Sequence, residues 1–173
     1  YLALLGPAEQ RERRLEDLYA TVERMATPQL QIRLLIQRSN FAVARGDFAK
    51  ADGYAKEAVK IAESIRVEVL AARALISMGQ RYIGAKGPEG LGLFTQALRI
   101  AQTYQALLTE ARANLALANY HLSHGMARTA LDEASRAETY FSQAKLPLDE
   151  LDANVLRARA FRTLGRIEES EKV

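Results

Sequence analysis

The chain has 173 residues, with 24 basic and 21 acidic side chains and no cysteine. The missing thiols exclude disulfides, cysteine-based zinc sites and cysteine nucleophiles, and no apolar run reaches the roughly 20 residues of a membrane span. A net charge of +3 is too small to predict a nucleic-acid partner by itself. Because 49% of the residues are apolar, we expect the chain to fold, and we expect a cytoplasmic protein.

The first predicted element is a helix over 8–26. Its apolar residues recur at spacings of three and four, which indicates one face packed on a neighbouring helix. They are Leu15, Leu18, Tyr19, Val22 and Met25.

Paired helices follow, with glycine and proline at their ends. Glycine closes three helical patterns, as a left-handed cap requires, and proline opens three, where its missing N–H costs nothing. These residues are Gly46, Gly125 and Gly165, and Pro28, Pro88 and Pro147. The predicted helices are 29–45, 48–65, 67–83, 88–104, 106–123, 127–145 and 148–164, with another starting at Arg166. Because the sequence begins at Tyr1 and ends within a helical pattern, we expect a fragment of a larger protein.

Three of these helices share one pattern of small residues, at spacings of 39 and then 40 residues. The shared columns are Ala51, Gly90 and Ala130, then Ala55, Phe94 and Ala134, then Ala58, Ala97 and Ala137. A fixed period of this length predicts an all-α solenoid of helix hairpins, in which each repeat packs only on its neighbours. We expect a right-handed superhelix of about 3.5 repeats behind a leading helix in 1–27. The repeats are 28–65, 66–105, 106–146 and a truncated 147–173.

The repeats resemble the tetratricopeptide repeat family. That family has a small residue in the first helix of each hairpin, a glycine before the turn and alanines at fixed offsets in the second helix. The matching residues are Ser39, Gly46, Ala51, Ala55 and Ala58, and two periods later Ala118, Gly125, Ala130, Ala134 and Ala137. The long period is similar to that of the repeats in LuxR-type bacterial activators such as the maltose-regulon activator. The resemblance implies a superhelix that takes part in ligand sensing or autoinhibition within a larger regulator.

No residue pattern in the chain predicts catalysis. His121 and His124 are three residues apart on one helix, but no further metal ligand stands beside them. We expect His121 to pack in the core and His124 to cap its helix. The segment GPEGLG is rich in glycine but has no lysine at the position where a phosphate-binding P-loop requires one. We therefore expect no enzyme, no metal and no cofactor.

A helical solenoid predicts binding through the first helix of each hairpin, which lines the concave side. In this register the candidate binding residues are Arg33, Asn40, Tyr82, Arg112, Leu115, Asn119, Leu122, Arg159 and Arg162. Asparagine can bind a peptide backbone with one donor and one acceptor, and arginine can bind a carboxylate. We expect a protein or peptide partner, which could be another domain of the same chain. The alternative is a sensor for a sugar or metabolite, with Tyr82 and Tyr120 as stacking residues.

The last hairpin raises two further questions about partners. Its arginine ridge (Arg159, Arg162 and Arg166) has no counterpart in earlier repeats, so we do not expect nucleic acid. We expect these arginines to pair with acidic residues such as Glu168, Glu169 and Glu171, or with a helix beyond the sequence. The apolar residues of helix 148–164 predict self-association through the C-terminal end. They are Leu148, Leu151, Val155, Ala158 and Phe161.

Overall fold

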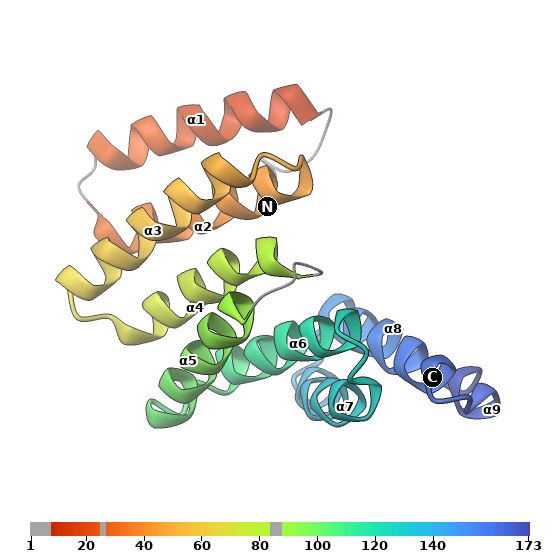
Figure 1. The fold of residues 1–173 in the computed structure, drawn as a ribbon. Helices are drawn as coiled ribbons and strands as arrows, with labels where there is room; N and C mark the ends of the chain where they lie inside the picture. Colours follow the sequence, from red (N-terminus) through yellow and green to blue (C-terminus); the bar gives the residue numbers. More distant parts are fainter. Residues whose placement is uncertain (1–7, 25–26, 84–87) are drawn as a thin grey trace. The chain divides into compact units, whose positions relative to one another are not determined.

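The computed structural model describes residues 8–24, 27–83 and 88–173, and every regular element in these ranges is a helix (Figure 1). In chain order they are α1 (Ala8–Arg24), α2 (Pro28–Ala44), α3 (Phe48–Ser64), α4 (Glu68–Gly79), the 3-10 turn η2 (Gln80–Tyr82), α5 (Glu89–Thr103), α6 (Leu107–Ser123), α7 (Ala127–Gln143), α8 (Pro147–Thr163) and α9 (Ile167–Ser170). The predicted all-α fold is confirmed for this part of the chain. None of its helices is long and apolar enough to cross a membrane.

One turn geometry ends six of the helices. In each turn, the residue after a left-handed residue donates its N–H to a carbonyl five positions earlier, as Asp47 does to Ala42 (2.9 Å). The left-handed residue is glycine at the three predicted stops, with φ of 74° to 78°. The other left-handed residues are Arg66, Gln105 and Lys145. A helix of 17 residues followed by a turn of three therefore recurs along the chain.

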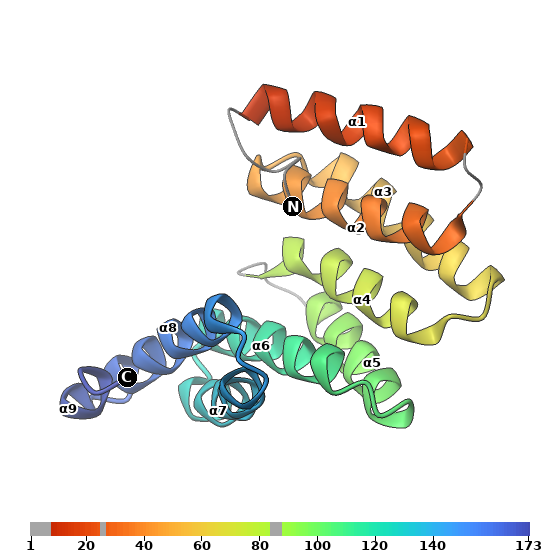
Figure 2. The same ribbon diagram turned by 180° about the vertical axis from the view of Figure 1, so that it is seen from behind.

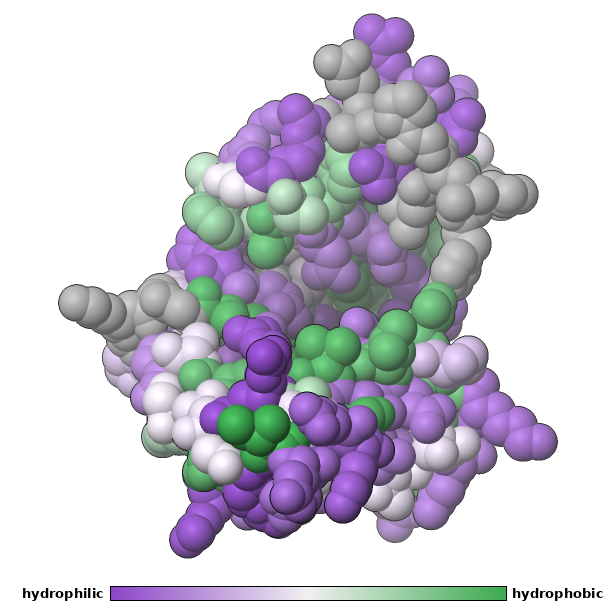
Figure 3. Space-filling view, turned by 90° about the vertical axis from the view of Figure 1, so that its right-hand side faces the viewer, coloured by the Kyte–Doolittle hydropathy of each residue, from purple (hydrophilic) through white to green (hydrophobic). Residues whose placement is uncertain are grey.

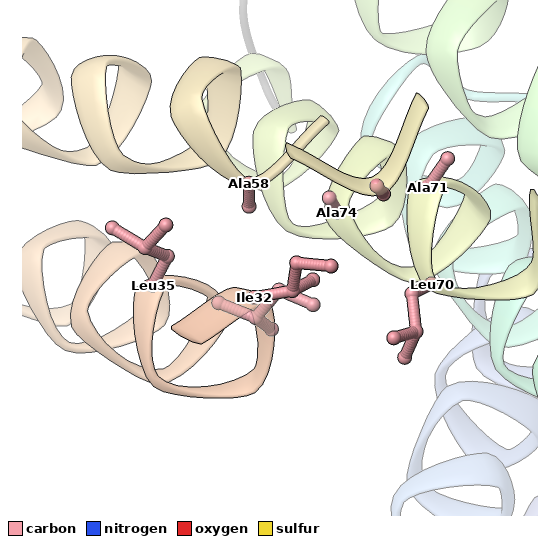
Figure 4. Close-up of a cluster of buried hydrophobic side chains, with 8 residues drawn as sticks. Ile32, Leu35, Ala58, Leu70, Ala71 and Ala74 are labelled. Atoms are coloured by element: carbon pink, nitrogen blue, oxygen red, sulfur yellow. The ribbon is translucent and has the colours of Figure 1, made fainter. Parts of the chain in front are cut away.

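The chain divides into two compact units, unit 1 (residues 1–78) and unit 2 (residues 79–173). In unit 1, α2, α3 and α4 enclose one hydrophobic cluster, part of which is labelled in Figure 4. The large buried side chains come from α2 and α4. The buried residues of α3 are alanines, which allow its backbone to approach closely, and larger α3 side chains such as Tyr54 and Ile61 pack at the edge of the cluster. The cluster consists of Ile32, Leu35, Ile36, Ala58, Ala62, Leu70, Ala71 and Ala74.

Unit 2 contains a second version of this cluster. It lies between α6, α7 and α8, which pack on one another in chain order (Figure 2). Its members each stand 79 residues after a member of the first cluster; they are Ala111, Ala137, Phe141 and Ala153. Among these matched positions, the large side chain is Ile32 of α2 in the first cluster and Phe141 of α7 in the second. The matched residues therefore have a similar total volume, although their identities differ. The repeat is therefore present in the packing as well as in the sequence, and the superhelix stays a prediction.

The second repeat differs from the others at one packing contact between its two helices, which is made by Phe94 and Gly79. Phe94 of α5 is fully buried in a column where the other repeats have alanine. Its ring lies against Gly79, where an added Cβ would come within 2.4 Å of a ring carbon. The ring fits because Gly79 stands where the other repeats have Asn40 and Asn119. Gly79 is also the last residue of α4, so this helix ends four residues before the predicted end at 83.

The predicted apolar stripe of the leading helix is only partly packed. Val22 is buried and Tyr19 packs against the cluster of unit 1, but Leu18 is exposed, contrary to the prediction. Tyr19 is one residue further on and therefore about 100° around the helix from Leu18, which faces solvent. Leu15 and Met25 lie outside the side chains that the structure describes.

Candidate functional site

Helix α8 exposes a column of residues that is buried in the other hairpins. Ile32, Ala71 and Ala111 occupy this column in α2, α4 and α6, and they are 0%, 2% and 2% exposed. Leu151 of α8 occupies the same column and is 59% exposed. In unit 2, α7 and α8 cover Ala111, and among the described residues the four-residue α9 is the element after α8 (Figure 1). In the described part of the chain, this column is thus uncovered at Leu151.

A second column shows the same difference. Ile36 and Leu75 are 5% and 6% exposed, and Leu115 packs against two buried clusters, but Val155 of α8 is 48% exposed. Leu148, seven residues before Val155, is 70% exposed. Because residues at spacings of three and four share one side of a helix, these leucines and Val155 form a single apolar stripe.

We call this surface the α8 face and define it as Leu148, Leu151, Asp152, Val155, Arg159 and Arg162. Figure 3 is a view from the side on which α8 and α9 lie in Figure 1, and its lower part has green hydrophobic patches among purple hydrophilic side chains. An apolar stripe bordered by charges is typical of a surface that binds another helix.

The charges of the α8 face stand in a fixed order along the helix. Asp152 lies in its first half, and Arg159 and Arg162 lie in its second half. Partial burial raises the pKa of Asp152, and the nearby carboxylate of Asp149 raises it further. Within the part of the chain that the structure describes, Asp152, Arg159 and Arg162 make no ion pair. All three charges are therefore available to a partner.

The predicted pairing of these arginines with Glu168, Glu169 or Glu171 is wrong for Arg159 and Arg162. Glu169 accepts from Arg166, whose Nε and Nη2 lie 3.0 and 2.6 Å from one carboxylate oxygen, and this contact lowers the pKa of Glu169. Arg166 is close enough because it begins the turn that contains Glu169, three residues on.

The candidate binding residues of α6 are held by α8. Arg112 donates from Nε to Asp149 (3.2 Å), which ties the two helices together. Leu115 and Leu122 are partly buried against the cluster that includes Leu156, so they contribute to the core. Asn119 is half-buried between them. These residues of α6 are therefore partly covered by α8, and their binding role stays a prediction.

In unit 1, Arg33 is exposed on α2, and the side chain of Asn40 accepts a hydrogen bond from Ser77 Oγ (2.7 Å). Arg33 shares its column with Arg112, but Leu70 stands where an acid corresponding to Asp149 would be needed. The two arginines therefore share a position and differ in their contacts.

The two tyrosines that the sequence suggested as stacking residues lie in different surroundings. Tyr82 is half-buried in η2, under the guanidinium of Arg81 (4.4 Å to the ring centroid). Tyr120 is buried, stacked on His124 at 4.0 Å and in edge contact with Phe94 at 6.3 Å. Tyr120 is therefore a core residue, and its predicted role in ligand stacking is wrong.

The two histidines occupy the places predicted for them. His124 Nδ1 lies 2.8 Å from the carbonyl of Tyr120, at the end of α6. His121 is buried, and its Nδ1 lies 2.7 Å from a carboxylate oxygen of Glu133 on α7. Burial raises the pKa of Glu133, although the hydrogen bond with His121 opposes this effect. Among the described residues, no group of three or more potential ligands could hold a metal ion.

Unit 1 has a pocket of about 460 Å³ between α1, α2 and α3, which sequence reasoning missed. Arg38 lines this pocket, and its guanidinium lies 4.8 and 4.3 Å from the ring centroids of Tyr19 and Tyr54. The pocket is lined by Glu16, Arg38, Phe41, Ala42, Arg45, Gly46, Asp47, Lys50 and Tyr54. These side chains come from three helices, so no spacing along the sequence could indicate the site.

No protein-family model matches this chain, and no curated protein matches it significantly. Membership of the tetratricopeptide repeat family therefore stays a prediction.

Proposed function

We propose that this chain is a protein-binding module of helix-hairpin repeats, and that the α8 face binds a helix of its partner. One observation carries the proposal: Leu151 and Val155 are exposed in columns that are buried in α2 and α4. In unit 1, Ile32, Ile36 and Ala71 of these columns lie in a cluster to which helix α4 contributes. In the first hairpins, the element that covers the equivalent surface is therefore a helix.

The strength of such binding follows from the area that a partner would cover. Fully burying a leucine or valine side chain contributes about 1.5–3 kcal/mol, but association also costs several kcal/mol of lost motional freedom. Three half-exposed side chains therefore supply only part of the binding free energy of a stable complex, and contacts around the stripe must supply the rest. The charges around the stripe then select the partner and its orientation.

The proposal is tested by selecting helical peptides from a random library on the immobilised chain. We expect selected peptides to lose roughly tenfold or more in affinity on the variant Leu151→Asp/Val155→Asp. Phe48→Asp is a matched control, because Phe48 is also 48% exposed but lies on α3 in unit 1. Equal binding of the peptides to all three proteins would contradict the proposal.

The pocket of unit 1 favours a second candidate function, the binding of a small anionic metabolite. Its volume falls in the range of about 300–1,000 Å³ that is typical of ligand pockets. Its lining has three basic, two acidic and two aromatic residues, a net excess of one positive charge, and the acids Glu16 and Asp47 pair with Arg38 and Lys50. Bound ligand raises the unfolding temperature. We expect a sugar phosphate to do so and the neutral sugar not to, with a smaller effect in Arg45→Gln than in the control Arg33→Gln. No shift with any anionic metabolite would exclude this candidate.

A further inference from the structure

Two charges of the α8 face, Asp152 and Arg159, are complementary to the same two charges on a second α8 helix that runs in the opposite direction. Asp152 and Arg159 are seven residues apart, which is two helical turns, so they lie on the same side of α8 at about 10 Å along its axis. Val155 lies between them, within the exposed apolar stripe. A second α8 running in the opposite direction presents an arginine opposite the aspartate and an aspartate opposite the arginine.

We propose that the partner of the α8 face is a second copy of this chain, bound through antiparallel α8 helices about a twofold axis close to Val155. This inference rests on the proposed function, because it requires that the face binds a helix. With the axis at that position, Asp152 faces Arg159 of the partner subunit, and the symmetric pair forms on the other side. Because a twofold axis repeats each contact, this ion pair forms twice and contributes twice to the free energy of dimerisation.

Charge disfavours a parallel arrangement of the two helices. If the two α8 helices ran parallel, Asp152 would face the same aspartate of the second copy, and Arg159 would face the same arginine. Like charges that face one another across an interface are unfavourable. The carboxylate of Asp152 also lies near that of Asp149, and an arginine from the second copy relieves this repulsion.

The size of the contact predicts a weak dimer. One helix from each copy buries less than the roughly 1,200 Å² of the smallest standard interfaces. Exposed ion pairs are also screened by salt, with a screening length of about 10 Å at 0.1 M and about 3 Å at 1 M. We therefore expect weak dimerisation, with a dissociation constant between about 0.1 and 1 mM, that weakens further as salt is added.

Sedimentation equilibrium of charge-exchanged variants tests the orientation. Asp152→Arg or Arg159→Asp alone replaces two attractive contacts with two repulsive ones, and we expect roughly tenfold weaker dimerisation at low salt. The double variant Asp152→Arg/Arg159→Asp restores both pairs in the antiparallel arrangement and should dimerise like the original chain. All these positions are exposed, and circular dichroism will show whether each variant keeps its helices.

A disulfide at the twofold axis provides a second, independent readout. The chain has no cysteine, so Val155→Cys introduces a single thiol, which can form a disulfide only if two copies bring their Cα atoms within about 7 Å. We expect a rapidly oxidised covalent dimer from this variant, and none from the control Phe48→Cys.

Three outcomes overturn the proposal: a chain that stays monomeric at millimolar concentration, a double variant that remains as weak as the single ones, or equal cross-linking at positions 48 and 155. The proposed function is tested separately. A monomeric chain that still binds selected peptides through Leu151 and Val155 overturns only the second-copy inference. A monomer that binds no peptide there overturns both.

Discussion

Positions 125 and 145 lie in two equivalent turns, and each is the left-handed residue of its turn, but they carry different side chains. Gly125 has φ of 78° and Lys145 has φ of 55°, and each precedes the residue that closes the turn. Glycine adopts this conformation without steric cost, whereas a residue with a Cβ is strained there. The three glycine turns were therefore predictable from sequence. The turns at Arg66, Gln105 and Lys145 were not, because a strained residue leaves no compositional signal.

This difference predicts opposite effects on stability. Gly125→Ala should lower the free energy of unfolding by about 1 kcal/mol, and Lys145→Gly should raise it by a similar amount. No atom lies within 4 Å of the Cβ that alanine would add at Gly125, so the effect isolates the backbone. Urea denaturation measures both variants. The same sign of change for both would contradict the assignment of the turn.

The alanine columns give a second prediction at the residue scale. Ala58 and Ala137 are fully buried between helices, so replacement by leucine should overpack the crossing and cost about 1–3 kcal/mol. Ala49 is an exposed alanine on α3, and Ala49→Leu serves as a control that should change stability little. Thermal unfolding compares the three variants. Equal melting temperatures would mean that the two columns do not lie at helix contacts.

The buried carboxyl of Glu133 predicts a dependence on pH. Burial raises its pKa above the value of 4.5 in the unfolded chain, so the folded protein holds this proton more tightly. Its contribution to stability is therefore full below pH 4.5 and is lost as pH rises through the folded pKa. His121 and Arg136 face the carboxylate and limit the effect. Denaturation between pH 4 and 7 should show a smaller fall for Glu133→Gln than for the original chain. Asp132→Asn removes only the smallest of the effects that act on this pKa and should keep most of the fall. An unchanged profile for Glu133→Gln would contradict the assignment.

At the scale of elements, the helix boundaries were largely predictable, because glycine and proline mark them. Predicted helices such as 48–65 and 127–145 differ from α3 and α7 by one or two residues at one end. The largest difference is the end of α4. It depends on Gly79 and Phe94, which are distant in sequence, and no local pattern reports such a contact.

The Gly79 and Phe94 pair predicts a coupling that can be measured. Gly79→Ala alone should cost roughly 1–3 kcal/mol, because the new Cβ would collide with the ring. In the background Phe94→Ala, which resembles the first and third repeats, the same change should cost much less. A double-mutant cycle by urea denaturation gives the interaction energy. Strictly additive effects would show that the two residues have no interaction energy and would contradict this prediction.

At the scale of the whole molecule, the sequence predicted repeats, and the structure shows the same core cluster in both units. The candidate site was predicted less well. Reasoning from register placed Leu115 and Leu122 on a binding surface, but α8 packs against them. Arg159 and Arg162 do lie on an exposed face. Whether a column is open depends on which helix covers it, and the sequence of the column alone does not contain that information.

The central claim is that the α8 face is a binding surface, and one fluorescence measurement tests it most directly. The chain has no tryptophan, so Val155→Trp places a single reporter at an exposed position in the middle of the face. We predict that its emission shifts to shorter wavelength as the protein concentration rises, or when a selected peptide is added, because a partner helix removes the indole from water. Emission typical of solvent-exposed tryptophan at every concentration and with every peptide would contradict the account.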